Sequence, residues 1–445
     1  MMKITRQSKY TFLIILISLT CSFDIFLNLT ISGFSFRISQ LVSMILILFW
    51  AINVLITQKI QLFIGSISLC IWSVCIIVFI PNTTFLTRNI GYAFWLILNA
   101  LMIFGMVKFI NEKNIKKILR QYLYSFAFIG IFGLLQFALG IIGIDPPFIT
   151  QWWTPRLPRI NGLSYEPSYY STYLLTGWVL IFYLCIEKIK ILKTIRKQYF
   201  LLFIITLAMV LSSSRMGILM MVLWIFRYVY LFLKYLGKGL IHKKYAIISF
   251  LGLITIISAT LYFINDFSKV SFLLNGTGIE GTASHSIDGR SYNLQNTIEV
   301  FKEHPKIGVS LGGIAPAIGE LHGVYVADQQ TAKMFEGQTI FAEVLAASGI
   351  FAFIPFVIFI LTIIIKPFKL AKKIPKENKN ILNSLTWALI ALLVILQFNQ
   401  NILRVYLWFH IGLLCSAYNI YKKEFNISNK KRRKIRIVLD KQKKI

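Results

Sequence analysis

Two arginines in this sequence stand where a charge is costly. Arg215 lies in LSSSRMG, between two apolar runs with almost no loop between them, and Arg404 lies in QFNQNILR, which repeats the pattern. A charged side chain at bilayer depth costs about 2.5–3.5 kcal/mol on insertion scales, so it is usually paired or functional. A guanidinium holds phosphate or carboxylate through paired hydrogen bonds. Arg215 and Arg404 are therefore candidate ligands of a phosphorylated group, although both side chains are also long enough to reach lipid head groups.

A second polar motif, RINGLSYEPS, runs from Arg159 to Ser168. Pro167 suits the first turn of a helix and Glu166 suits the positive end of the helix dipole, which is a purely structural interpretation. Glu166 also follows Arg156 and Arg159, and a carboxylate in that position is placed to accept a proton from a substrate hydroxyl. The sequence leaves both interpretations open. Four aromatic residues nearby suit either sugar stacking or anchoring at the membrane interface: Trp152, Trp153, Tyr165 and Tyr169.

The longest polar segment, residues 266–337, contains a third motif. The stretch 288–303 (DGRSYNLQNTIEVFKE) includes Arg290 and predicts an amphipathic helix lying on the membrane spans. Its apolar positions at helical spacing are Leu294, Ile298 and Phe301. The helix is expected to end at His304–Pro305.

Several common chemistries are not indicated. The stretch KIGVSLGG lacks the Gly-Lys-Ser/Thr ending of a P-loop and follows no strand, which argues against ATP binding. His285, His304 and His322 are not at metal-ligand spacing, and neither HExxH nor DxD occurs. The letters of GxSxG occur once, in GVSLG (308–312), but no strand precedes them and no Ser/His/Asp order stands out. The sequence predicts no metal, no cofactor and no hydrolytic triad.

The elements that position these motifs are membrane helices. The chain of 445 residues is 57% hydrophobic and only 14% charged, with a mean hydropathy of +0.70, whereas soluble domains are about 45–50% apolar and about 25% charged. Runs near the roughly 20 residues that cross a bilayer recur along the chain. We expect an all-α polytopic protein with twelve spans at about 10–30, 38–56, 60–80, 90–109, 121–144, 166–186, 199–213, 216–234, 245–264, 338–365, 381–398 and 402–420.

The distribution of positive charge orients these spans. With the N-terminus inside, 36 of the 47 Lys and Arg residues fall in inner segments, which places both termini in the cytoplasm. The net charge of +30 then serves topology and anionic inner-leaflet lipids, and does not indicate nucleic acid binding. The outer segments contain seven Arg against four Lys, and the inner ones seven Arg against 29 Lys. This skew indicates a phosphorylated ligand reached from outside.

The expected organisation is one membrane-embedded domain over residues 1–445. Two extracytoplasmic loops, 145–165 and 266–337, are long enough to contribute to function, and the larger one precedes the last three spans. Residues 421–445 form a basic cytoplasmic tail. Function is therefore expected at the outer face.

The order of the motifs resembles the Wzy-type O-antigen and capsule polymerase/ligase superfamily. The likeness extends over about 150–355, from RxxGLSxEP through SSSR, the helix containing Arg290 and HPxxGV, to EGQTIFAEVLAASGIF. It implies an enzyme of the bacterial inner (plasma) membrane that acts on undecaprenyl-pyrophosphate-linked glycan at the outer face, without metal. It also implies that Arg159, Arg215 and Arg290 hold the lipid pyrophosphate. A chain-length regulator is a partner that the resemblance leaves open.

One departure bears on the activity. The ligase branch opens the span after the large loop with His-Asn, but Gln338 and Thr339 stand here. We therefore expect a polymerase that joins repeat units into O-antigen, capsular or exopolysaccharide, with a ligase as the alternative. A flippase or transporter is a second alternative, disfavoured because no two six-span halves are seen.

The expected catalytic residues are Glu166, Arg215 and Arg290, with Glu336 as the alternative base. The residues expected to bind substrate are Arg156, Arg159, Arg404, His304, Gln338, Glu336 and Tyr165.

Overall fold

The computed structural model describes residues 6–31, 34–154, 157–237, 283–337, 339–398 and 402–442. The expected span at 245–264, together with Arg156 and Gln338, lies outside the described residues.

Helices make up most of the described chain. Their bounds are α1 (Arg6–Thr20), α2 (Ile38–Thr57), α3 (Ser66–Val78), α4 (Leu86–Phe109), α5 (Ile115–Ile141), α6 (Pro167–Ile186), α7 (Ile195–Leu211), α8 (Arg215–Gly237), α11 (Ala283–Glu303), α12 (Ile314–Leu321), α13 (Gln329–Ala332), the 3₁₀ helix η1 (Lys333–Phe335), α14 (Ile340–Ala371), α15 (Lys376–Ile395) and α16 (Val405–Gln442). Two short antiparallel hairpins complete the fold: β1 (Asn28–Ile31) with β2 (Phe34–Arg37), and β3 (Trp152–Thr154) with β4 (Leu157–Pro158).

Each expected span that falls within the described residues coincides with a helix. Six of the described helices, α2, α4, α5, α6, α14 and α15, are long and apolar enough to cross a membrane. These helices indicate a multi-pass membrane protein, and the total of twelve spans stays a prediction.

The first span is shorter than expected. The sequence predicts a helix over 10–30, but α1 ends at Thr20 and Asp24 lies beyond it. The backbone N–H groups of Asp24 and Ile25 both donate to the Leu163 carbonyl, at 2.9 and 3.0 Å. Because these donors bind the loop before α6, they do not continue the helix, and the chain turns into the β1–β2 hairpin.

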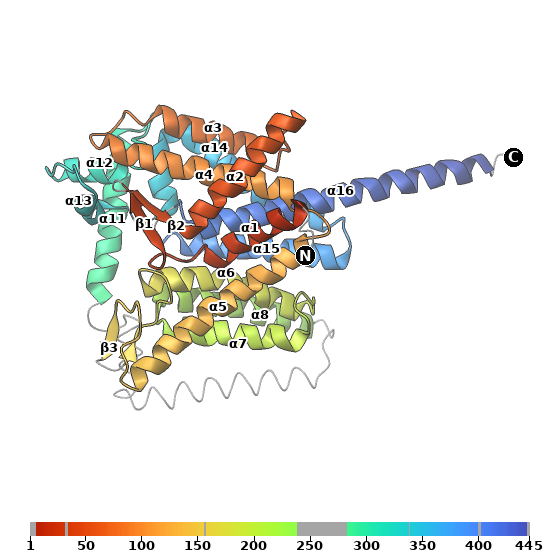
Figure 1. The fold of residues 1–445 in the computed structure, drawn as a ribbon, viewed down its shortest axis with the longest axis horizontal. Helices are drawn as coiled ribbons and strands as arrows, with labels where there is room; N and C mark the ends of the chain where they lie inside the picture. The colour runs from red at the N-terminus through yellow and green to blue at the C-terminus, as the bar shows by residue number, and fades with distance from the viewer. Residues whose placement is uncertain are drawn as a thin grey trace.

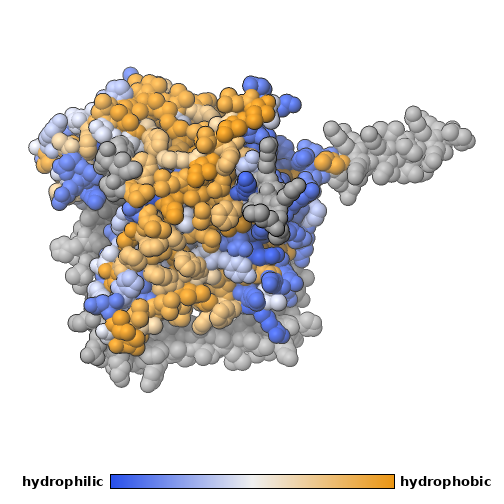
Figure 2. Space-filling view, in the orientation of Figure 1, coloured by the Kyte–Doolittle hydropathy of each residue, from blue (hydrophilic) through white to orange (hydrophobic). Residues whose placement is uncertain are grey.

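Most of the helices run side by side, so that their ends gather at two opposite ends of the bundle (Figure 1). Both hairpins and α11–α13 lie at one end of the bundle, and the N-terminus and the long extension of α16 lie at the other. We call the first the outer end and the second the inner end, following the lysine asymmetry. Figure 2 shows a broad apolar surface between the two ends, and α2 and α3 expose Leu48, Leu55, Ile67 and Val74 there. This surface suits contact with lipid.

The centre of the bundle is formed by α6 and the first half of α16, which are buried on nearly all sides. Tyr170, Tyr173 and Trp408 are among the largest fully buried side chains. A helix that is apolar all round is suited to such a position. Because α6 and α16 begin at the outer end, their first residues are fixed by the packing of the whole bundle.

The glycine-rich stretch after α11 packs against a break in α14. Gly349 has φ +58° and ψ 178°, so the helix is interrupted there. The freed backbone groups bind the stretch instead: Ser310 N–H donates to the Ala347 carbonyl at 2.9 Å, and Ile350 N–H donates to the Pro305 carbonyl at 2.9 Å. A Cβ on Gly308 would overlap the Ala347 carbonyl. The glycines therefore permit close backbone contact.

The amphipathic helix of the large loop is present, but its buried face differs from the prediction. Helix α11 ends at Glu303, directly before His304–Pro305 as expected, and packs on α14. Val300 is fully buried, whereas Ile298 is 39% exposed. The buried side of α11 is formed by Asn296, Thr297 and Val300, and Phe301 packs against the core beside it, so apolar spacing predicted only part of the buried face.

The close approach at Gly308 makes a stability prediction. We expect Gly308→Ala to cost about 3 kcal/mol of unfolding free energy or more, at the upper end for overpacking, because the clash is with backbone. Gly323→Ala is the control: nothing lies within 4 Å of its Cβ position, and its φ of +68° costs only about 1 kcal/mol. Thermal unfolding in detergent measures both, and equal losses would contradict the proposed contact.

Candidate functional site

Arg159, Arg215 and Glu166 come together at the outer end. Arg159 donates from Nη1 to Gln151 Oε1 at 2.6 Å and from Nη2 to the Ser213 carbonyl at 3.2 Å. Burial lowers the pKa of Arg159, Arg215 lowers it further, and Glu166 raises it. Two guanidinium groups and one carboxylate therefore interact here, with a net positive charge that favours an anion.

The loop that carries Arg159 is fastened to α5 by one side chain. Gln136 donates from Nε2 to the Gly162 carbonyl at 3.0 Å and accepts from Gly162 N–H at 2.8 Å. Gly162 has φ +57°, and a Cβ there would overlap the ring of Tyr170. Asn161 donates to the Phe148 carbonyl at 2.9 Å and so closes the loop. The Asn-Gly pair of RINGLSYEPS is therefore the structural part of the motif.

The SSSR turn places Arg215 at the first residue of α8. Helix α7 ends at Leu211, Ser213 takes the left-handed conformation with φ +51°, and all three serines are buried. A Cβ on Gly217 would overlap Ser171 Oγ, so α8 begins in close contact with α6. Arg215 is half-buried at a helix N-terminus, where the backbone dipole also favours an anion.

Glu166 occupies the N-cap position of α6, with Pro167 as the first helical residue, as the sequence predicts. Its side chain is exposed, and Oε2 accepts a hydrogen bond from Ser168 Oγ at 3.1 Å. The neighbouring Tyr165 is exposed as well, and its hydroxyl accepts from Asn28 Nδ2 at 3.0 Å. The structure therefore supports the helix-start interpretation, and leaves the carboxylate accessible from outside.

Arg404 is held in a buried ion cluster. Its Nη1 lies 3.1 Å from both carboxylate oxygens of Asp24, and Arg37 Nη2 lies 3.2 Å from Asp24 Oδ1. Arg404 is 6% exposed and Asp24 is 2% exposed. The guanidinium also lies over the Tyr169 ring, 4.0 Å from its centroid. Arg404 is thus paired within the protein, in a cluster of two guanidinium groups and one carboxylate, and its role in substrate binding stays a prediction.

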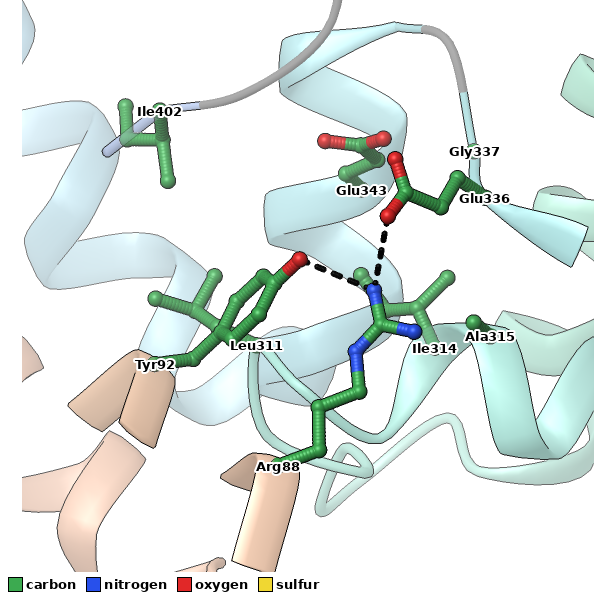
Figure 3. A pocket seen from close by; sticks show the side chains of 9 residues that line it. All are labelled: Arg88, Tyr92, Leu311, Ile314, Ala315, Glu336, Gly337, Glu343 and Ile402. Carbon is green, nitrogen blue, oxygen red and sulfur yellow. Dashed lines mark hydrogen bonds and ion pairs between the residues drawn. The ribbon is translucent and has the colours of Figure 1, made fainter. Parts of the chain in front are cut away.

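A second carboxylate site lies at the start of α14 (Figure 3). Arg88 Nη2 donates to Glu336 Oε1 at 3.0 Å and to the Tyr92 hydroxyl at 2.8 Å. Glu343 lines the same cavity, beside Glu336 and Gly337. The cavity has a volume of about 30 Å³, which is enough for one or two water molecules and too small for a sugar.

These groups form one continuous band, which we call the outer charged band: Arg159, Arg215, Glu166, Tyr169, Arg404, Asp24, Arg37, Glu336, Arg88 and Glu343. Tyr169 interacts electrostatically with Arg404, Glu166 and Glu336, and so connects the three clusters. Each member lies either in the first turn of a helix that begins at the outer end or in a segment that adjoins an outer helix end. Arg290, expected in the same site, falls within α11 at this end of the bundle.

Residues 200–357 match the family model of the O-antigen ligase domain, Wzy_C. The matched segment begins in α7 and ends in α14, so it includes the SSSR turn, Arg290, Glu336 and Glu343. The match is consistent with the O-antigen polymerase/ligase superfamily, whose members are membrane glycosyltransferase-like enzymes that act on lipid-linked glycans. It does not distinguish a polymerase from a ligase. A comparison with curated proteins finds no match.

Two histidines of the matched segment, His304 and His322, have different surroundings. His322 stacks on Tyr292 and Phe335, with ring centroids 5.6 and 6.3 Å apart, and Phe335 directly precedes Glu336. His304, predicted to bind substrate, is exposed at the end of α11. Among the described contacts, none joins His304 to the outer charged band.

Sequence reasoning missed Glu343 and gave Arg88 no specific role. Glu343 lies in FAEVLAASG, which looks like the first turn of an ordinary span, and Arg88 stands 248 residues from its partner Glu336. The available signal for Glu343 was a carboxylate within a membrane helix, which is rarely without function.

The buried ion cluster makes the second prediction. Asp24→Asn leaves Arg404 with an uncompensated charge, so we expect a loss of about 3–5 kcal/mol in unfolding free energy. Asp24→Asn with Arg404→Gln should recover part of this loss, because both charges are gone. The control is Lys116→Gln: its pair with Glu377 is exposed at 2.7 Å, and its loss should cost at most about 1 kcal/mol. A double variant no more stable than Asp24→Asn in thermal unfolding would contradict the cluster's role.

Proposed function

We propose that this protein is a polysaccharide polymerase that transfers glycan from an undecaprenyl-pyrophosphate carrier onto a second lipid-linked repeat unit, at the outer face of the bacterial inner membrane. The observation that carries the proposal is the Arg159–Arg215 pair beside Glu166, with Arg215 inside the segment that matches the O-antigen ligase domain.

The reaction requires stabilisation of a leaving group. The acceptor hydroxyl oxygen attacks the anomeric carbon, the bond from that carbon to the phosphate oxygen breaks, and the electron pair stays on the lipid pyrophosphate. Negative charge therefore develops on the phosphate oxygens. Arg159 supplies a guanidinium held by Gln151 and the Ser213 carbonyl, and Arg215, half-buried at the first residue of α8, supplies a second one beside it. Positive groups already in place stabilise such charge without rearrangement.

The hydroxyl proton needs an acceptor, and two expected carboxylates differ in availability. Glu336 is bound to Arg88 at 3.0 Å in a water-sized cavity, and a paired carboxylate is a weaker base. Glu166 is exposed, accepts a hydrogen bond from the Ser168 hydroxyl and lies beside the arginines that would hold the donor. We assign the proton acceptor to Glu166, with Glu336 as the alternative.

The choice of polymerase over ligase rests on the sequence. Gln338 stands where the ligase branch has histidine, and a glutamine amide does not accept a proton as a base. A ligase would need another base, and His322, which stacks on Phe335, is the candidate for it. A transporter would leave the paired outer arginines without a role.

The first functional prediction concerns the leaving group. With purified protein, EDTA and polyprenyl-pyrophosphate-linked repeat units, we expect a product ladder that Arg215→Ala reduces by about 100-fold or more, because charge stabilisation at the leaving pyrophosphate is lost. Arg196→Ala is the control, since Arg196 is exposed at the inner end of α7. Transport of the unit across vesicles without a ladder would instead identify a flippase. Transfer to lipid A core alone would identify a ligase.

The second functional prediction separates the two carboxylates. We expect Glu166→Gln to reduce the rate by at least about 100-fold, as for loss of a general base, while Glu336→Gln keeps a measurable ladder. Glu166→Asp should retain part of the activity, with a pH profile of the same shape. If Glu166→Gln forms the ladder at the wild-type rate, Glu166 only starts the helix and the base lies elsewhere in the band.

A further inference from the structure

A larger cavity opens at the inner end of the bundle, remote from the outer charged band. It has a volume of about 580 Å³ and lies between the end of α6, the α14–α15 connection and the start of α15. The 20 residues of α6 separate it from Glu166 by about 30 Å. This volume is in the range of small-molecule binding sites.

Three exposed lysines line the rim of the cavity: Lys372, Lys376 and Lys379. One carboxylate, Glu187, lines it too, so the lining carries a net charge of about +2 at neutral pH. Arg227 of α8 interacts electrostatically with Tyr183 of the lining and adds to the positive potential. The cavity therefore favours an anion despite Glu187.

The floor of the cavity is polar and rigid. Asn380, 2% exposed, donates from Nδ2 to Glu187 Oε2 at 3.0 Å. Asn383 donates from Nδ2 to the Tyr183 hydroxyl at 3.3 Å. Because that hydroxyl accepts from Asn383, its own O–H remains a donor. The buried Asn383 Oδ1 has no hydrogen-bond partner in the described part of the chain. Such a group is costly unless a ligand or water completes it.

We propose that this cavity binds the phosphate of an anionic phospholipid head group from the inner leaflet. The lysines and the Tyr183 hydroxyl supply donors for phosphate oxygens. A lipid is favoured over a soluble phosphate because the cavity lies at the inner end of α14, which exposes Ile358, Leu361 and Ile365, so acyl chains can extend along that helix. Basic pockets between helices on this side of a membrane suit such head groups.

The test uses the full-length protein in detergent with phosphatidylglycerol, read out by native mass spectrometry and by the shift in melting temperature. Each lysine near a head group contributes about fivefold in affinity. We therefore expect Lys372→Gln, Lys376→Gln and Lys379→Gln together to weaken binding by on the order of 100-fold. The matched control replaces Lys190, Lys193 and Lys197, which are exposed at the same end but do not line the cavity.

Two glutamate variants, each of which makes the net charge of the inner end more positive by one, sharpen the test. Glu187→Gln removes the one carboxylate in the lining and should tighten binding several-fold, while glutamine can still accept from Asn380. Glu377→Gln makes the same charge change on α15 outside the lining and should have a smaller effect. Equal effects of both glutamate variants, or of both lysine sets, would show that binding depends on the overall surface charge and not on the cavity, and would overturn the proposal. Equal protection by glycerol 3-phosphate would identify a soluble ligand and also overturn it.

Discussion

Asp24 brings a carboxylate into the interior of the bundle, and the arrangement of the outer end depends on how that charge is matched. It meets Arg404 from the segment before α16 and Arg37 from the end of β2, so residues 380 positions apart are joined at 3.1 Å. A single buried charge left without its partner costs several kcal/mol. The ion cluster therefore joins the chain after α1, the end of the β1–β2 hairpin and the start of α16. Tyr169, on the first turn of α6, packs against the same guanidinium.

Backbone contacts complete this arrangement where side chains leave no room. The break in α14 at Gly349 frees carbonyl and N–H groups, and the stretch after α11 binds them. Asn89 of α4 donates to the Val309 carbonyl at 3.0 Å, which ties the same stretch to the helix that carries Arg88. The stretch after α11 therefore holds α4, which carries Arg88, against the broken helix α14, and Glu336 lies just before α14. Arg88 and Glu336 meet there beside a water-sized cavity.

The two ends of the bundle differ in the kind of cation they use. At the outer end, arginines are half-buried or buried and hold defined acceptors, including the Ser213 carbonyl, Asp24 and Glu336. At the inner end, lysines line an open cavity and remain exposed. A planar guanidinium suits fixed, paired hydrogen bonds, and a flexible ammonium suits a mobile head group. The contrast accords with catalysis at one face and lipid contact at the other, as proposed above.

The sequence alone determined the helical class, a helix at each expected span within the described residues, the start of α6 at Pro167 and the end of α11 at Glu303, because these depend on local apolar runs, proline and charge. It also gave the resemblance to the O-antigen polymerase/ligase superfamily that the match over residues 200–357 supports, while the roles of the arginines stay predictions. It did not predict the short helices α12 and α13. Only the tertiary structure decided that Arg404 pairs with Asp24, that Glu343 joins Glu336 beside Arg88, and that Val300 and not Ile298 forms the buried face of α11. Each of these outcomes depends on contacts between residues far apart in the chain. Helical spacing and residue type carry no information about which distant partner satisfies a buried charge.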